Sequence, residues 1–196
     1  MNARDDWRRA VIAGHRADEP SARTAIADPD PTTREFGFAA LHRMQRLTER
    51  DLANAIADDA PAVRRRAALI AAHLPSTDLA ALLDDSDATV VEAAAWAAGE
   101  HALSTDHIVN RLVSLATEAS NALVREAAVA ALGAIGDERG LPAILSGCRD
   151  KPAIRRRAVL ALAPFDGPEV EAALAAALTD HDWQVRQSAE DVSPQP

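Results

Sequence analysis

The chain has 196 residues, of which 48% are hydrophobic, and its formal net charge is −9. It contains no tyrosine and only three phenylalanines and three tryptophans, so leucine and alanine must fill the core, as in closely packed helices rather than aromatic β-sandwiches. The acidic balance disfavours generic binding to nucleic acid or anionic membranes.

Compartment signals are few. No apolar run approaches the length of a membrane-spanning helix, and the N-terminal residues MNARDDWRRA lack the apolar stretch of a secretory signal. The single Cys148 forms no internal disulfide, which fits a reducing compartment. We therefore expect a soluble, cytoplasmic protein.

In chain order, an amphipathic helix over residues 5–17 comes first, and we expect it to cap the array with Trp7, Val11 and Ile12 on its apolar side. Six helix–turn–helix units follow, over about 20–46, 47–74, 75–101, 104–136, 137–164 and 166–191. Their first helices are expected near 21–27, 49–57, 77–83, 106–117, 138–148 and 168–178. Their second helices are expected near 31–46, 61–73, 88–101, 122–135, 152–163 and 183–191, several opening with proline. We predict one repeat domain over residues 1–192 and a disordered tail over 193–196.

One short motif recurs in every unit. It consists of an Asp-rich turn, a β-branched residue, in most units an arginine directly after that residue, and an alanine-rich helix. The β-branched residues are Thr33, Val63, Val90, Val124, Ile154 and Val185. Four residues after each stands glycine or alanine: Gly37, Ala67, Ala94, Ala128, Ala158 and Ala189. A period of about 30 residues marks a solenoid, in which each unit buries its apolar face against its neighbours. The sequence thus predicts an all-α, right-handed α-solenoid of about six repeats.

The pattern resembles HEAT repeats, in particular the bacterial HEAT-like units named for phycobilisome lyase subunits. The resemblance depends on Asp-Asp-Ala-Pro-Ala-Val-Arg (58–64), Asp-Lys-Pro-Ala-Ile-Arg (150–155) and Asp-His-Asp-Trp-Gln-Val-Arg (180–186), and extends over residues 21–190. It implies that the second helices line the concave side. Such repeats serve scaffolds, lyase subunits, a di-iron hydroxylase and base-excision glycosylases, so the fold alone selects no activity.

Acidic and basic side chains recur at fixed places around each turn. The turn carboxylates are Asp28, Asp58, Asp85, Asp150 and Asp180, and the arginines after the β-branched residue are Arg34, Arg64, Arg125, Arg155 and Arg186. We expect each arginine to meet a carboxylate of its own or the adjacent unit, in a structural ladder of charge-assisted hydrogen bonds. Val91 replaces the arginine in the third unit and interrupts the ladder.

A binding groove is predicted from the outward positions of the second helices. Two and six residues after the β-branched position, side chains share the solvent-facing side of the helix. The predicted partner-binding residues are Arg65, Leu69, Glu92, Trp96, Glu126, Arg156 and Leu160. Trp96 would anchor an apolar side chain, because tryptophan and arginine are enriched among binding hot spots. The alternative is that Trp96 fills an irregular gap between repeats and that the arginines form a solvated rim.

Catalytic functions lack the groups they require. A di-iron hydroxylase of this type needs paired His-Glu dipeptides, and only the reversed Glu100-His101 occurs. The remaining histidines are scattered singly and Cys148 has no evident histidine partner. We predict no catalytic residue, no metal site and no cofactor.

The sequence therefore favours a noncatalytic scaffold or adaptor that binds another protein or peptide. A monomer is favoured, no membrane partner is expected, and a nucleic-acid partner is disfavoured. Two alternatives stay open. One is a subunit of a phycobilin-lyase-like or other HEAT-repeat enzyme, and the other is a nucleic-acid-binding protein of the DNA glycosylase type. The second would use Trp96, Trp183 and the arginine triplets 64–66 and 155–157.

Overall fold

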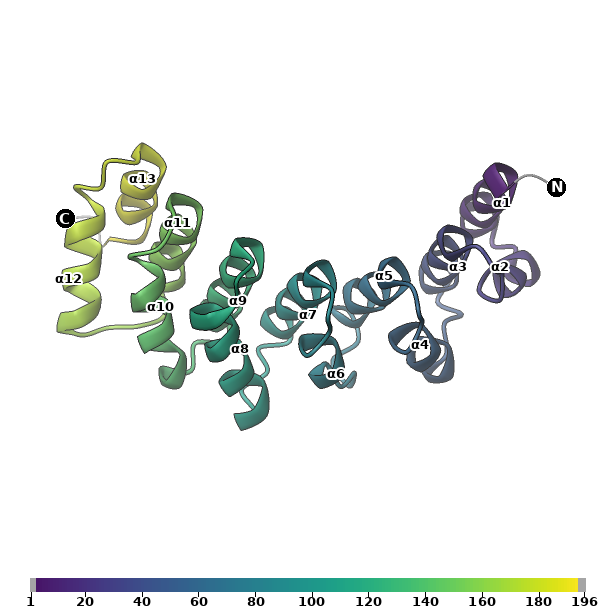
Figure 1. Cartoon of the computed structure of the whole chain (residues 1–196), viewed down its shortest axis with the longest axis horizontal. Coiled ribbons are helices and arrows are strands. Elements are labelled where there is room, and N and C mark those ends of the chain that lie inside the picture. Colours follow the sequence, from purple (N-terminus) through teal and green to yellow (C-terminus); the bar gives the residue numbers. More distant parts are fainter. Residues whose placement is uncertain (1–2, 194–196) are drawn as a thin grey trace. The chain divides into compact units, whose positions relative to one another are not determined.

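Helices account for all regular secondary structure in the computed structural model, which describes residues 3–193. The helix of the N-terminal segment is α1 (Ala3–Arg16). The first helices of the units are α2 (Glu19–Ala25), α4 (Glu49–Ile56), α6 (Ala80–Leu83), α8 (Asp106–Glu118), α10 (Leu141–Gly147) and α12 (Pro168–Ala177). The second helices are α3 (Pro31–Arg43), α5 (Pro61–Ala71), α7 (Ala88–Glu100), α9 (Ala122–Ile135), α11 (Pro152–Ala161) and α13 (Trp183–Val192) (Figure 1). The all-α solenoid prediction is confirmed.

Local sequence explains where the helices begin. The Asp30 carboxylate accepts hydrogen bonds from the Thr33 N–H and hydroxyl group, both at 2.9 Å, and Pro31 follows at the first helical position of α3. Thr48 and Asp51 form a reciprocal capping box at the start of α4. These side chains bind backbone N–H groups that have no partner inside the helix.

Two first helices differ from the sequence prediction. In the third unit the helix was expected over 77–83 but spans only Ala80–Leu83, because the Asp78 carboxylate accepts the Ala80 N–H and holds the preceding residues in a turn. In the fifth unit the expected helix 138–148 is divided into a 3₁₀ turn, Glu138–Gly140, and α10.

The chain divides into two compact units, residues 1–90 and 91–196, and each is described by itself. In the first unit, α1, α3 and α5 lie side by side in one layer, with α2 packed against α3 and α4 against α5. The N-terminal helix thus takes the place of a second helix beside the first full repeat. The prediction of a single domain over residues 1–192 stays a prediction, and of the predicted tail, residues 194–196 lie outside the described residues.

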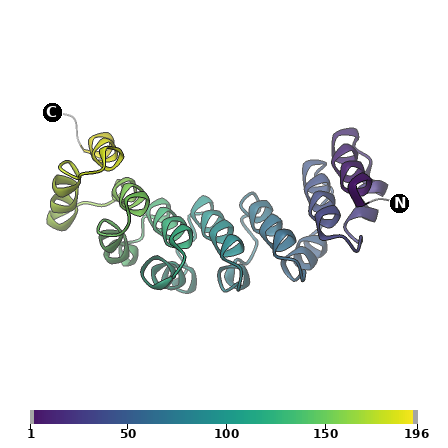
Figure 2. The same cartoon turned by 45° about the horizontal axis from the view of Figure 1, so that its top comes forward.

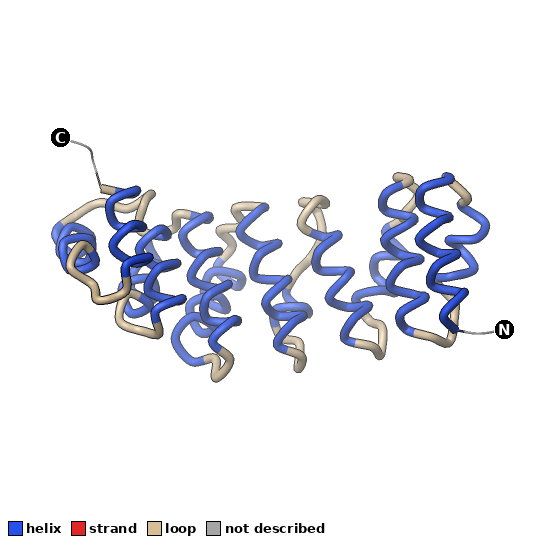
Figure 3. The backbone as a smooth tube through the Cα atoms, turned by 90° about the horizontal axis from the view of Figure 1, so that it is seen from above, coloured by secondary structure: helices blue, strands red, loops and turns tan. Residues whose placement is uncertain are grey.

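In the second unit, α9, α11 and α13 pack in sequence, while α8 and α10 pack behind α9, and α12 packs against α11 and α13. Figure 2 shows these helix pairs, and Figure 3 shows the second helices running side by side. None of the helices in the described residues is both long and apolar enough to span a membrane.

Small residues set the spacing between packed helices. Ala67, Ala128 and Ala158 are fully buried, and Gly133 on α9 faces α11 so closely that an added Cβ would lie 2.5 Å from Cβ of Ala161. The column of small residues has a steric cause, because it faces the first helix of its own repeat: a Cβ added to Gly37 would lie 2.9 Å from Cβ of Ala25 on α2, and one added to Gly147 on α10 would lie 3.1 Å from Cβ of Ala158. A larger side chain in this column would push the two helices of a repeat apart.

Candidate binding surface

Arginines and aspartates of consecutive repeats bind each other across the turns. Arg34 donates from Nε and Nη2 to the two carboxylate oxygens of Asp58, both at 2.8 Å. The same two-point geometry joins three further pairs: Arg64 to Asp85, Arg125 to Asp150 and Arg155 to Asp180. Each arginine therefore contacts the carboxylate of the following repeat, which is one of the two arrangements that the sequence allowed.

The same arginines also fix their own turn. Arg64 Nη1 donates to the carbonyl oxygens of Asp58 and Asp59, both at 2.9 Å. Arg186 in the last repeat keeps this contact, with Nη1 2.6 Å from the carbonyl oxygen of Asp180. Asp28 in the first turn accepts the Asp30 N–H at 2.9 Å. The ladder residues are thus engaged in holding turns and repeats together.

The interruption at Val91 involves both partners of the missing pair. Val91 is buried, and Ala119 stands in the turn of the following unit where Asp58 and Asp85 stand in theirs. Arg125 still donates to the carbonyl oxygen of Ala119 at 2.7 Å, so the turn keeps its backbone contact. The break at Val91 was predicted from the sequence, but Ala119 was not. The turn aspartates Asp58 and Asp85 stand five residues before their β-branched residues, and the same count back from Val124 gives Ala119.

The arginines hold the aspartates in their charged form. Hydrogen bonds from Arg64, Arg125 and Arg155 lower the pKa of Asp85, Asp150 and Asp180 below the ordinary value. For Asp58, burial acts to raise the pKa, but hydrogen bonds from Arg34 and the Ala60 N–H outweigh it and the pKa is lowered.

The predicted groove residues fall in both units. Glu92, Trp96, Glu126, Arg156 and Leu160 belong to the second unit, and all retain exposed surface. Trp96 is 41% exposed, whereas its chain neighbours Ala95 and Ala97 are buried. Arg156 Nη1 lies 3.4 Å from the Gln184 side-chain oxygen, and Arg157 lies 3.8 Å from Glu126. On these second helices the exposed ring of Trp96 therefore lies among side chains of both charge signs.

In the first unit, Arg65 is exposed and Leu69 is half-buried on α5. The surface beside them on α1 and α3 was not predicted from the sequence. There, Trp7 contacts Phe36 with ring centroids 5.6 Å apart, and the Arg8 guanidinium lies over the Trp7 ring. Phe36 stands three residues after Thr33, the β-branched residue of its repeat. The aromatic side chain at this position is the feature of the sequence that could have predicted this surface.

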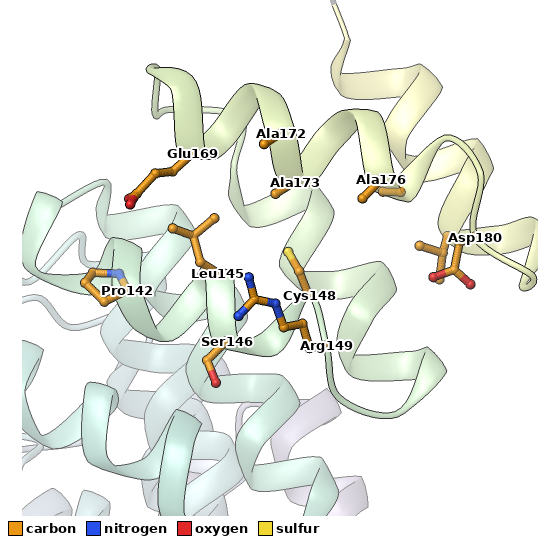
Figure 4. A pocket seen from close by; sticks show the side chains of 12 residues that line it. Pro142, Leu145, Ser146, Cys148, Arg149, Glu169, Ala172, Ala173, Ala176 and Asp180 are labelled. Carbon is orange, nitrogen blue, oxygen red and sulfur yellow. The ribbon is translucent and has the colours of Figure 1, made fainter.

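A cleft opens between first helices of the second unit. It has a volume of about 660 Å³ and lies between α10 and α12, where Ala172, Ala173 and Ala176 face Leu145 and Cys148 (Figure 4). Short alanine side chains leave this space open. Burial raises the pKa of the Cys148 thiol to about 11, so the sulfur stays protonated and is a poor nucleophile at neutral pH.

Metal-binding groups do not gather in the described part of the chain, where no cluster of three or more His, Cys, Asp or Glu side chains is found. His42 and His73 stack with centroids 5.7 Å apart. Burial, and secondarily the neighbouring His73, lower the pKa of His42.

Stacked helix pairs joined by a repeated turn contact define this protein as an α-helical repeat protein. The model for HEAT repeats matches residues 76–157, which confirms the predicted resemblance to HEAT repeats. The narrower likeness to phycobilisome lyase units stays a prediction. A comparison with curated proteins gives no match.

Solved structures share the fold. The Escherichia coli protein YibA is similar with a TM-score of 0.63 and 17% identity, over 96% of this chain and 68% of that one. A designed armadillo repeat protein gives a TM-score of 0.60 at 18% identity, over 88% of this chain and 97% of its own. Another, in complex with the peptide (KR)4, gives 0.58 at 18% identity, over 98% of each chain.

Proposed function

We propose that this protein is a noncatalytic scaffold that binds a partner protein or peptide on its second-helix faces. The observation that carries the proposal is Trp96, 41% exposed on a helix whose neighbouring residues are buried. A large ring kept at the surface adds little to the core but offers apolar contact area to a partner.

The division of roles among the arginines supports this assignment. Arg125 and Arg155 have side chains only 13% and 16% exposed and are held by Asp150 and Asp180. Arg156, directly after a ladder arginine, instead donates from Nη1 to the exposed Gln184 side-chain oxygen at 3.4 Å. The array therefore has one set of cations for internal cohesion and another for its surface.

Residue roles follow from chemistry and position. Trp96 and Leu160 supply apolar contact, while Glu92, Glu126 and Arg156 select the charge of the partner in the second unit. Arg65 and Leu69 contribute in the same way to the face of the first unit. The designed armadillo repeat protein in complex with (KR)4 supports peptide binding by a fold of this kind. We further propose that the protein is a cytoplasmic monomer and uses no cofactor.

A pull-down from lysate of the native host tests it. The wild-type chain is compared with the double variant Trp96→Ala, Arg156→Glu and with the control Leu178→Ala, Arg149→Glu, which changes an equally exposed apolar residue and an exposed arginine at the ends of the first helices α12 and α10. Circular dichroism and thermal melting establish that all three are folded.

We expect partners that the wild type and the control retain and the Trp96 variant loses. Partners retained equally by all three proteins would exclude the Trp96 face as the binding surface. A purified wild-type protein that turns over a substrate or carries a bound chromophore would contradict the noncatalytic assignment.

A further inference from the structure

Charge is distributed unevenly within the first unit. Its carboxylates lie mainly in the turns and on α2 and α4, whereas α1, α3 and α5 are rich in arginine. From residue 6 onward, the acids of these three helices are Asp6 and Glu35, and they form ion pairs with Arg9 and Arg66. Arg34 and Arg64 pair with the turn aspartates Asp58 and Asp85. Over the same residues, the remaining arginines of the layer are Arg8, Arg16, Arg43 and Arg65. In a chain of net charge −9, the layer formed by α1, α3 and α5 is therefore locally basic.

This basic layer contains an apolar depression. It has a volume of about 120 Å³ and is lined by Val11 from α1, by Phe36, Ala39, Ala40 and Arg43 from α3, and by Arg66 from α5. Its walls are aliphatic and aromatic, and two guanidinium groups belong to its rim. The volume has room for one aliphatic side chain, and burial of such a side chain against apolar walls is favourable.

The surroundings of the depression keep its shape. Trp7 packs on Phe36 and is covered by Arg8. Arg66 is oriented by Glu35, which accepts Nη2 at 2.7 Å and Nε at 3.2 Å. Arg43 Nη1 lies 3.1 Å from Nε2 of His15, so Arg43 contacts an imidazole here rather than a carboxylate. Because these side chains are already held in place, little conformational entropy would be lost from them when a ligand binds.

We propose that this surface binds an acidic peptide segment that inserts one aliphatic side chain between α1 and α3 and pairs its flanking carboxylates with Arg43 and Arg66. Planar guanidinium groups match carboxylates, and the depression selects the apolar side chain. The inference rests on the proposed function, since it takes the second-helix layer as the binding surface, and it names the chemistry of the partner.

Nucleic acid fits this surface less well. Base stacking needs an open aromatic face, but the Trp7 ring already contacts the Arg8 guanidinium and the Phe36 ring. A long polyanion would also meet the carboxylates of the turns, whereas a short acidic segment contacts the basic layer alone. Attraction between exposed charges is screened beyond about 8 Å at physiological salt, which favours the short ligand.

Fluorescence anisotropy with the full-length chain and defined peptides tests the proposal. The probe is labelled Glu-Asp-Glu-Leu-Glu-Asp-Glu, and its comparison peptides are the same sequence with serine in place of leucine and the basic peptide (KR)4. An oligothymidylate of equal charge represents nucleic acid. We expect saturable binding of the leucine peptide that is about tenfold weaker with serine, as the burial of one leucine side chain predicts, and no binding of (KR)4.

Variants locate the site. Arg43→Gln removes one carboxylate partner and Ala39→Leu fills the depression without changing charge, and each should weaken binding about tenfold or more. The control Arg50→Gln removes an exposed cation from α4, in the other layer of the same unit, and should leave affinity unchanged. Melting curves exclude unfolding as the cause.

Equal affinity of the leucine and serine peptides, or of the wild type and Ala39→Leu, would overturn the insertion of a side chain. Tighter binding of the oligothymidylate would overturn the peptide assignment. The proposed function is judged separately by the Trp96 pull-down. If the leucine peptide does not bind but the pull-down gives a Trp96-dependent partner, only this inference is rejected. If the leucine peptide binds but no partner depends on Trp96, only the Trp96 face is rejected.

Discussion

Arg64 and Asp85 join two consecutive repeats, with Nε and Nη2 of the arginine 2.6 and 2.9 Å from the two carboxylate oxygens. The side chains are only 16% and 7% exposed, so neither charge is well solvated if its partner is removed. Stacking in this protein is therefore enforced by charge pairing at the turns as well as by alanine packing between helices.

Removing the Asp85 carboxylate should destabilise the first unit. We expect Asp85→Ala to lower the free energy of unfolding by about 2–4 kcal/mol, because it leaves the Arg64 guanidinium buried without its anion. Urea unfolding monitored by circular dichroism measures the change. Asp59→Ala, at an exposed position of the preceding turn, should stay within about 0.5 kcal/mol, and equal effects of the two variants would contradict the ladder.

Acid should weaken the ladder. Arginine partners lower the folded-state pKa of Asp85, Asp150 and Asp180, so their contribution to stability is present above the unfolded-state pKa of about 3.9. This contribution is lost as the pH falls through the lowered pKa values of the folded state, because the unfolded chain binds more protons than the folded chain in this pH range. Urea midpoints against pH should fall less steeply for Asp180→Asn than for the wild type. Parallel curves would show that Asp180 makes no such contribution.

His42 should titrate below the usual pH range of a histidine, because burial and, secondarily, the stacked His73 lower its pKa. The folded state thus binds protons less readily than the unfolded chain near the ordinary value of about 6.5. Protonation of His42 therefore destabilises the fold as the pH drops below that value. NMR titration should give a higher pKa for His42 in His73→Gln than in the wild type. An unchanged pKa would leave burial as the whole cause.

Gly133 tests the steric basis of repeat spacing. Glycine to alanine ordinarily favours a helix interior by about 1 kcal/mol, but here the new Cβ would lie 2.5 Å from Cβ and 2.6 Å from Cα of Ala161. We expect Gly133→Ala to be destabilising in thermal melts. Gly99→Ala, where the nearest atom is Cα of Ala131 at 3.1 Å, serves as the comparison and should cost less. A more stable Gly133→Ala protein would show that α9 and α11 separate freely.

The thiol of Cys148 should react slowly in the folded protein. Burial raises its pKa to about 11, so the reactive thiolate is scarce at about pH 8 compared with a free cysteine. Labelling with a chromogenic disulfide reagent should be slow in buffer and fast in urea. Equally fast labelling in both conditions would mean that the cleft between α10 and α12 leaves the sulfur solvated.

Sequence by itself determined the repeat, the order of helices and most of their boundaries. Turn residues such as Asp30 and Pro31 act on backbone groups within a few positions, and the column of Ala67 and Ala128 recurs at a fixed period, so both are visible in a linear chain. The shortness of α6 was not predicted, because the Asp78 side chain competes locally with the helix for a backbone N–H.

Tertiary structure decided which repeat supplies each partner. The period placed Arg64 near two carboxylates, in its own turn and in the next, and only the packed chain selects Asp85 over Asp58. The basic layer around Phe36 also needed coordinates, because Val11, Ala39 and Arg66 come from three helices far apart in sequence. Periodicity specifies which side chains repeat, whereas a depression forms only where helices from different repeats pack against one another.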